Sequence, residues 1–243
     1  MSYGRTKRIL VILYGDISFD GRVKRIIEIA AAHGDVILVD VSEQRIASPV
    51  PGVARHERIV MKRNWGNVRR HLSFWLRCLS AALRHRPATV FAEDFFTTFA
   101  GYMSARMARA HLVYDAHELI IPEKDGSRFV REQFWYYLER LTVRRCNLVI
   151  AANPERAEIM QRHYSLPVCP TYMRNIPRWP EAKAIPVSDL RSICGFLVKS
   201  GPSDKIVIYQ GVMSIRRGID RFVEAMSYLP PNFRLILVGD GPD

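Results

Sequence analysis

The 243-residue sequence has no long hydrophobic run. A membrane-spanning helix needs roughly 18 consecutive apolar residues, and no segment comes near that length. The apolar stretch Ile9–Tyr14 follows a basic start, but it is too short for a signal peptide and no small-residue cleavage site comes after it. We therefore expect a cytoplasmic protein.

Cysteine and glycine do not occur in the patterns that mark common sites. The four cysteines form no C-x-x-C pair and have no metal-like spacing with histidine: Cys78, Cys146, Cys169 and Cys194. We expect buried free thiols and no metal site. No G-x-G-x-x-G turn follows the first predicted strand, which disfavours a dinucleotide-binding fold of the usual kind.

Acidic residues are outnumbered. The chain has 36 Lys and Arg residues against 24 Asp and Glu residues, and its formal net charge is +12. That charge favours an anionic partner, such as nucleic acid, anionic lipid or a phosphorylated substrate. Between Val53 and Pro87 the sequence has nine basic residues and one acidic residue, Glu57. Because the charge is concentrated there, an acidic surface suits it better than a nucleic acid.

Short β-branched runs alternate with longer helical patterns, which predicts an α/β fold with a parallel sheet. The predicted strands are Ile9–Tyr14, Val36–Asp40, Thr89–Ala92, Leu112–Asp115 and Leu148–Ala152, and in a second unit Ile206–Gln210 and Leu235–Val238. The predicted helices are Arg22–Ala32, Val68–Arg86, Thr98–Ala110, Phe129–Arg145 and Glu155–His163, and in the second unit Arg216–Tyr228.

Prolines punctuate the chain between the two units, at 177, 180, 186 and 202. We predict a complete N-terminal Rossmann-like domain over 1–178, a linker over 179–204, and the start of a second domain over 205–243. A single strand–helix–strand unit cannot enclose a core of its own. The second domain is therefore expected to be truncated.

The candidate site residues of the first unit follow its predicted strands, where ligands of open α/β sheets bind. In the first loop Gly15 allows a tight turn, Asp20 caps the next helix, and Arg22 suits an anionic oxygen unless it lies in solvent. Asp94 belongs to an acidic pair after a later strand, although it also suits a helix cap. Asn153 and Asn175 follow further strands, and either also fits a plain turn.

His117 is the more specific candidate, because it titrates near neutrality and follows a strand between two acids, Asp115 and Glu118. Asp115 would fix its orientation; a satisfied structural histidine is the alternative. In the second unit Arg216 and Arg217 come after the turn at Gly211, an arrangement typical of a diphosphate cradle at a helix N-terminus. A solvated arginine pair is the alternative there.

Several short motifs occur in an order that resembles glycosyltransferase family 4, the retaining, nucleotide-sugar-dependent branch with the GT-B fold. The motifs are Asp20-Gly21-Arg22-Val23, Tyr114–Glu118, Asn175-Ile176-Pro177, Tyr209-Gln210-Gly211 with Arg217-Gly218-Ile219, and Val238–Pro242. The resemblance implies two Rossmann-like domains facing each other across a cleft. The first would hold mainly the acceptor and the second mainly the donor.

The resemblance also implies roles for single residues. Gly15 and Asp16 would face the donor phosphate and the acceptor, and His117 would contact the transferred sugar. Arg217 would hold the donor diphosphate, with Arg216 replacing the second basic residue of the family, where this chain has Val212. The nucleotide side would be lined by Gly239, Asp240 and Gly241, and the cleft by Asp20, Arg22, Asp94, Glu118, Asn153 and Asn175.

The implied activity is transfer of a sugar from a nucleoside-diphosphate sugar to an envelope or surface polysaccharide or glycolipid acceptor, with retention and without a metal or cofactor. The family's E-x7-E segment would lie beyond Asp243, so the chain as given is expected to be a poor catalyst. The alternative is a non-catalytic basic α/β module that binds anionic membrane or nucleic acid.

The predicted helix Val68–Arg86 suggests a membrane surface. One face is apolar: Val68, Leu72, Trp75, Leu76, Leu79 and Leu83. Arg70, Arg77 and Arg84 follow the opposite face, with Phe74 at its border. A basic row beside an aromatic is typical of a helix on anionic lipid, and a core-packed helix with solvated arginines is the alternative. The protein would then be peripheral on the inner face of the cell membrane.

Overall fold

The computed structural model describes residues 7–44, 49–62, 64–121, 130–176 and 204–241. The chain divides into two compact units, 1–177 and 178–243, and we describe each by itself. The predicted linker over 179–204 lies outside the described residues except for its last position.

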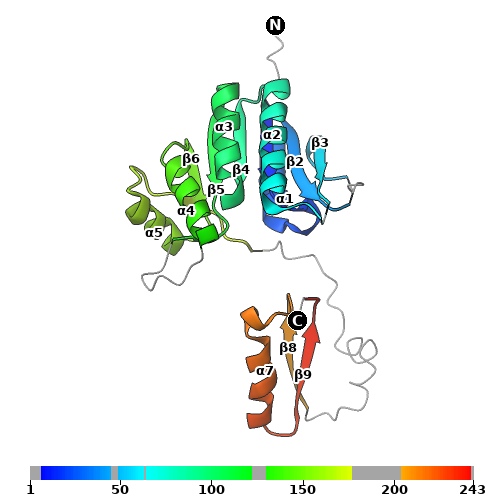
Figure 1. The fold of residues 1–243 in the computed structure, drawn as a ribbon. Coiled ribbons are helices and arrows are strands. Elements are labelled where there is room, and N and C mark those ends of the chain that lie inside the picture. The colour runs from blue at the N-terminus through cyan, green and yellow to red at the C-terminus, as the bar shows by residue number, and fades with distance from the viewer. Residues whose placement is uncertain (1–6, 45–48, 63, 122–129, 177–203, 242–243) are drawn as a thin grey trace. The chain divides into compact units, whose positions relative to one another are not determined.

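The first unit is a parallel sheet in the order β3-β2-β1-β4-β5-β6-β7 (Figure 1). Its strands are β1 (Arg8–Leu13), β2 (Asp35–Ser42), β3 (Val53–Val60), β4 (Thr89–Glu93), β5 (His111–Asp115), β6 (Leu148–Ala151) and β7 (Thr171–Tyr172). The helices of this unit are α1 (Gly21–Ala31), α2 (Asn67–His85), α3 (Thr98–Ala108), α4 (Val130–Val143) and α5 (Pro154–Tyr164). Short 3-10 turns, η1 (Ile17–Phe19) and η2 (Phe95–Thr97), precede α1 and α3.

The central strands are buried on both faces, which explains their continuous apolar runs. In β1, Val11 points into a core with α1, whereas Leu10 and Ile12 point into the larger core that α2 and α3 cover. Gly101 lets α3 approach the sheet closely, since a Cβ there would lie 2.7 Å from the Cβ of Ala92. The strands and helices predicted for this unit are all confirmed, with ends that differ by at most a few residues.

Two strands of the first unit, β3 and β7, were not predicted from the sequence. β3 carries Arg55, His56, Glu57 and Arg58 in its centre and is half-exposed at the sheet edge, so it has no apolar run to reveal it. β7 has two residues, which is too short for any periodicity. The basic segment 53–87 therefore contains an edge strand as well as α2.

The second unit consists of β8 (Lys205–Gln210), η4 (Ile215–Arg217), α7 (Ile219–Ala225), η5 (Met226–Tyr228) and β9 (Phe233–Val238). β8 and β9 pair in parallel. Of the residues described between 204 and 241, only Ile236 is buried. The expectation that this unit encloses no core of its own is confirmed for these residues.

The predicted orientation of α2 was wrong. Phe74 is fully buried, so it faces the core rather than a membrane, and Cys78, Ala81 and Ala82 are buried beside it. The predicted apolar face points outward instead, with Val68, Leu72, Leu76 and Leu83 all exposed. Small residues allow α2 to approach the sheet, and this close packing, which a hydrophobicity pattern cannot register, decided which face is buried.

The cysteine prediction is confirmed in part. Cys78 is a buried free thiol, whereas Cys146 is partly buried and Cys169 is exposed. Cys194 lies outside the described residues. Among the helices that the structure describes, none combines the length and the apolarity that crossing a membrane requires.

The orientation of α2 can be tested by truncating one residue from each face. Phe74→Ala removes a fully buried ring and should lower the free energy of unfolding by about 3–5 kcal/mol. Leu76→Ala, on the exposed face, should change it by about 0.5 kcal/mol or less. Urea denaturation of the two variants measures both values, and a larger loss at Leu76 would contradict the observed packing.

Candidate functional site

The sheet order changes direction at β1, because successive crossovers lead to β2 on one side and to β4 on the other. Open α/β sheets bind ligands at such a switch point, beyond the carboxyl ends of the strands. Charged residues from the ends of β4 and β5, from the loops that follow β1, β4 and β5, and from the first turn of α1 meet at this edge: Asp20, Arg22, Glu93, Asp94, Asp115 and His117. We call this group the acid–histidine cluster.

Arg22 and Asp115 form the buried centre of the cluster. The guanidinium of Arg22 donates to both carboxylate oxygens of Asp115: Nε lies 2.8 Å from Oδ2, and Nη2 lies 2.5 Å from Oδ1. Arg22 also donates to the backbone oxygens of Met173 and Ala151. Arg22 therefore neither lies in solvent nor remains available to an outside anion, and in this respect the prediction for it was wrong.

Asp20 fixes where Arg22 lies. As predicted, it caps α1, and its side chain accepts hydrogen bonds from the backbone N–H groups of Arg22 and Val23 at 3.0 and 2.9 Å. The cap satisfies donors that the first helical turn leaves free. It places Arg22 in the first turn of α1, where the side chain reaches Asp115 in β5.

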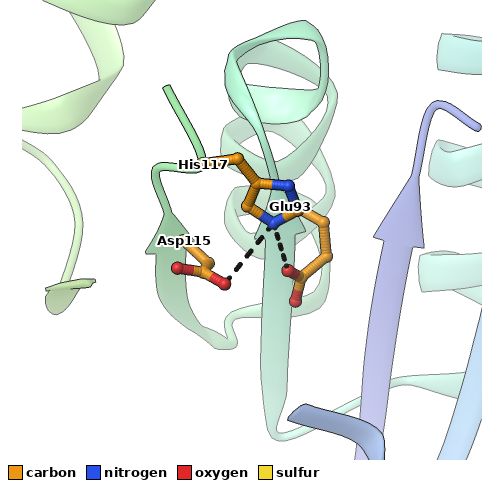
Figure 2. Close-up of side chains that lie close together, drawn as sticks. All are labelled: Glu93, Asp115 and His117. Atoms are coloured by element: carbon orange, nitrogen blue, oxygen red, sulfur yellow. Dashed lines mark hydrogen bonds and ion pairs between the residues drawn. The ribbon is translucent and has the colours of Figure 1, made fainter. Parts of the chain in front are cut away.

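His117 lies above two buried carboxyl groups (Figure 2). Its Nε2 is 3.2 Å from Glu93 Oε2 and 3.5 Å from Asp115 Oδ2, and its Nδ1 is 3.9 Å from Asp20 Oδ2. Arg156 donates to its backbone oxygen at 2.8 Å. The imidazole is 17% exposed, whereas Glu93 and Asp115 have no exposed side-chain surface. His117 is thus the member of this trio that a ligand can reach.

Burial and charge set the proton affinities of this trio. Burial disfavours a charged His117, but hydrogen bonds and attraction from Asp115 and Glu93 outweigh it and raise its pKa to about 10. Burial raises the pKa of Glu93 to about 8, helped by repulsion from Asp115. Burial also opposes charge on Asp115, yet His117 and Arg22 hold the pKa of that carboxyl below its usual range. At neutral pH the trio of His117, Asp115 and Glu93 therefore presents an imidazolium next to one carboxylate and one protonated carboxyl group.

Asp94 lies beside the trio in a strained backbone conformation, with φ of +67°. It precedes η2, but its side chain makes no capping hydrogen bond, so the helix-cap alternative is excluded for it. Its Oδ1 and Glu93 Oε1 are buried without a hydrogen-bond partner among the described residues, and burial raises the pKa of Asp94 to about 6. Strain and unsatisfied polar atoms of this kind are typical of functional sites.

Glu93, Asp115 and His117 each offer one ligand atom, and these atoms lie within 4.8 Å of one another. A divalent cation can in principle use such a group. Here Arg22 already occupies both oxygens of Asp115, and a cation would have to displace the proton of His117. The donor set is therefore better suited to holding protons than to holding a metal ion.

A second charged network at the same edge was not predicted. Arg58 of β3 donates to Asp40 at 2.6 Å and to Asp16 at 2.9 Å, and His56 contacts Asp40 at 2.9 Å. Ser42 donates to Asp16 at 2.6 Å. Hydrogen bonds and the charge of Arg58 outweigh burial and lower the pKa of Asp16 to about 2. Asp16 is thus held by the protein itself. In the sequence its partner Arg58 ends a run of four consecutive polar residues, 55–58, which has no apolar pattern to mark a strand.

The other residues predicted in the first unit are not members of the trio. Asn153 caps α5 by accepting from the Arg156 N–H at 2.8 Å. Asn175 accepts from Arg25, 150 residues earlier, and so makes a tertiary contact with α1. Glu118, directly after His117, is exposed, and the place of these residues in a cleft stays a prediction. Gly15 does not adopt a positive φ and a Cβ there would make only ordinary contacts, so the tight-turn argument for it was wrong.

In the second unit the two glycine-containing loops lie side by side. Gly211 donates to Val238 at 3.0 Å, and Met213 donates to Asp240 at 3.0 Å. A Cβ at Gly239 would lie 1.8 Å from the oxygen of Gly211, and one at Gly241 would lie 1.8 Å from the oxygen of Met213. Only glycine permits this approach, which places Gly211 and the 239–241 turn at one edge. Their predicted role in binding a nucleotide sugar stays a prediction.

The arginine pair differs from its prediction. Arg216 and Arg217 lie in the 3-10 turn η4, and Gly218, with φ of +74°, separates them from α7. They are therefore not in the first turn of a helix, because glycine interrupts the helical pattern. Arg217 and Asp240 are exposed, and the side chain of Arg216 lies outside the described part of the chain.

Removing Arg22 should be costly, because it leaves the buried carboxylate of Asp115 without its partner. We expect Arg22→Met to lower the free energy of unfolding by about 3–5 kcal/mol. Adding Asp115→Leu should recover much of that loss, since no charge then remains unpaired. Arg25→Met, in the same helix but half-buried and hydrogen-bonded to the exposed residue Asn175, is the matched control and should cost about 1 kcal/mol. Strictly additive effects of Arg22→Met and Asp115→Leu in urea denaturation would contradict the coupling.

The raised pKa of Glu93 makes stability depend on pH. Its folded pKa of about 8 exceeds its unfolded value, so its contribution is complete in acid and is lost as pH rises towards 8. Asp94 and Glu139, whose pKa values burial raises to about 6 and 7, act in the same direction. The free energy of unfolding should therefore fall between pH 5 and 8, and Glu93→Gln should flatten this slope. Exposed Glu118→Gln is the control, and an equal effect there would contradict the assignment.

No family model and no curated protein matches the sequence. Solved structures match its fold. HepE from Anabaena, in complex with UDP and glucose, is 17% identical with a TM-score of 0.65 over 98% of this chain and 62% of that chain. Sucrose-phosphate synthase from Thermosynechococcus elongatus is 18% identical with a TM-score of 0.68 over 96% of this chain and 62% of that chain.

A putative UDP-N-acetylglucosamine 2-epimerase from Listeria monocytogenes also matches, at 8% identity and a TM-score of 0.59, over 96% of this chain and 62% of that chain. The chain thus spans 62% of the length of these proteins. At these identities the likeness shows the fold, and family 4 membership stays a prediction. The predicted α/β architecture of GT-B type, with Rossmann-like parallel sheets, is confirmed.

Proposed function

We propose that the chain belongs to a glycosyltransferase that moves a sugar from a nucleoside-diphosphate sugar to a polysaccharide or glycolipid acceptor with retention of configuration. The observation that carries the proposal is the acid–histidine cluster at the switch point of a GT-B-type sheet. The solved neighbour HepE, which holds UDP and glucose, supports the choice of donor class.

In this proposal His117 is the catalytic-site residue that touches the transferred sugar. It is exposed enough to donate a hydrogen bond to a sugar oxygen, and its raised pKa keeps it protonated at neutral pH. Asp115 and Glu93 are positioning residues, because they are fully buried and act through the imidazole. A preorganised donor of this kind favours the charge that develops as a diphosphate leaves.

The second unit would supply the nucleotide side. Arg217 and Arg216 would hold the diphosphate, and the adjacent loops at Gly211 and at 239–241 would let the nucleotide approach the backbone closely. The leaving group needs cationic donors, and this scheme assigns them to arginine and uses no metal or cofactor. Loss of one such donor typically costs about 3–4 kcal/mol of transition-state stabilisation.

The acceptor would be part of the cell envelope or surface, reached by a peripheral protein on the inner face of the membrane. The support is α2, whose exposed apolar residues Val68, Leu72, Leu76 and Leu83 run beside the exposed residues Arg77 and Arg84. Exposed apolar side chains beside cationic ones suit an anionic lipid surface. Phe74 has no part in this surface because it is buried.

The test, made with the full-length protein, is release of UDP from UDP-glucose in the presence of lipid-linked acceptors, together with the melting temperature of the protein. We expect UDP-glucose to raise the melting temperature by several degrees, because a ligand stabilises the state that it binds. His117→Gln should lower transfer about 100-fold or more, with the fold intact by circular dichroism.

His111→Ala is the matched control, because His111 is exposed at the opposite end of β5. Its transfer rate should equal that of the parent protein. Normal turnover by His117→Gln would overturn the proposed role. Steeply salt-dependent binding to polyanions, with no response to UDP-glucose, would instead favour the non-catalytic basic module.

A further inference from the structure

An apolar cavity of about 660 Å³ opens at the same edge of the sheet as the acid–histidine cluster. Tyr14, which follows β1, and Phe96, which follows β4, form its inner side, and the first half of α2 and Trp135 of α4 form its walls. Its volume is within the range of small-molecule sites, and such sites are mostly apolar with a few polar groups. We call it the aromatic cavity.

The walls of the aromatic cavity are held by ring contacts. Phe96 packs edge-on against Trp135 with centroids 5.0 Å apart, and Tyr14 lies 5.6 Å from Phe96. Tyr14 also contacts Phe74, the fully buried residue of α2, at 5.1 Å. Because these rings brace one another and the core, the cavity is preformed and does not need a ligand to organise it.

Its described lining carries one cation, Arg70, beside other polar groups: Asn67, His71, Trp75 and the hydroxyl of Tyr14, which hydrogen-bonds to the Arg70 guanidinium. Arg70 and Trp75 line the cavity, and Arg70 Nε and Trp75 Nε1 are buried without a hydrogen-bond partner among the described residues. No Asp or Glu lines the cavity among those residues. A buried donor without a partner is costly, and an anion would satisfy these two donors and neutralise the guanidinium.

The mouth of the cavity is apolar and continues along α2. Val68 and Leu72 line the cavity, yet they are 82% and 52% exposed, so they form its rim. Leu76, one turn beyond Leu72, continues this exposed apolar path outside the cavity. A ligand with an apolar chain can therefore occupy the cavity while the end of its chain extends along this exposed apolar surface, which shields the chain from water.

We propose that the aromatic cavity binds a lipid phosphate: an anionic head at Arg70 and Trp75, with an apolar chain that leaves past Val68 and Leu72. The proposal rests on the proposed function and names its acceptor class. The cavity and the acid–histidine cluster are adjacent in the chain, since Asp94 of the cluster immediately precedes η2, which contains Phe96. A neutral glycan would bring no anion to the donors of Arg70 and Trp75, and free phosphate would leave the apolar walls exposed to water.

The test is binding of geranyl phosphate, a soluble lipid phosphate, measured by quenching of tryptophan fluorescence. Geranyl phosphate should bind at least tenfold more tightly than geraniol and than inorganic phosphate. Arg70→Gln should abolish the preference over geraniol, and Leu72→Arg should weaken binding of geranyl phosphate at least tenfold. Arg106→Gln on α3 and Leu141→Arg on α4, both exposed and outside the cavity, are the matched controls and should leave binding within twofold.

Equal affinity for geraniol and geranyl phosphate would overturn the anionic head, and loss of binding in the controls would overturn the cavity as the site. This assay contains no sugar nucleotide, so its failure is separate from failure of the glycosyltransferase proposal. With donor present, Arg70→Gln should raise the KM for a lipid phosphate acceptor and leave the thermal shift by UDP-glucose unchanged. A loss of that shift would overturn the assignment of Arg70 to the acceptor.

Discussion

The ion pair between Arg22 and Asp115 joins the parts of the site. One guanidinium connects the first turn of α1 to the end of β5, and it also donates to the backbone oxygens of Ala151, at the end of β6, and of Met173, directly after β7. Two buried charges cost desolvation energy that only close geometry and further hydrogen bonds offset. Here both conditions hold, and the result is a carboxylate that stays ionised in a buried position.

That ionised carboxylate sets the chemistry around it. Because Asp115 keeps its charge, His117 above it is held as an imidazolium. Burial raises the pKa of Glu93, and repulsion from Asp115 adds to that effect. The second network at the same edge acts on Asp16 as the first acts on Asp115, since hydrogen bonds together with the charge of Arg58 lower the pKa of Asp16. Two carboxyl groups with arginine partners are thus kept ionised, whereas burial keeps Glu93 protonated, which is how one sheet can offer different proton affinities over a short distance.

The aromatic cavity belongs to the same edge for a topological reason. The connection after β1 leads to β2 on one side of the sheet, and the connection after β4 leads to β5 on the other side. The loops at the ends of β1 and β4 therefore diverge, and a space opens where these two strands end. Charged residues occupy the part of this edge towards β5, and Tyr14, Phe96 and Trp135 occupy the part towards α2 and α4. A charged cluster next to an apolar cavity suits the proposed acceptor, a lipid phosphate, because that molecule has both kinds of group.

Local patterns in the sequence determined much of the fold. The strands β1, β2, β4, β5 and β6 and the helices between them followed from sequence patterns, because strands buried on both faces consist mostly of apolar residues. Their buried acids, Asp40, Glu93 and Asp115, lie near the carboxyl ends of the strands. His117, Asp115 and Asp20 were also recognised, since each lies at a strand end or a helix start, which local rules describe.

Tertiary structure decided the rest, because it depends on which residues far apart in the chain come into contact. The buried face of α2 was set by small residues against the sheet, and not by its most hydrophobic stripe. Arg22 is not available to an outside anion, because it pairs with Asp115, which lies 93 residues later in the chain. The cavity, the unpartnered donor of Arg70 and the network of Asp40 and Arg58 exist only once the strands are in register, and no pattern of neighbouring residues encodes that register.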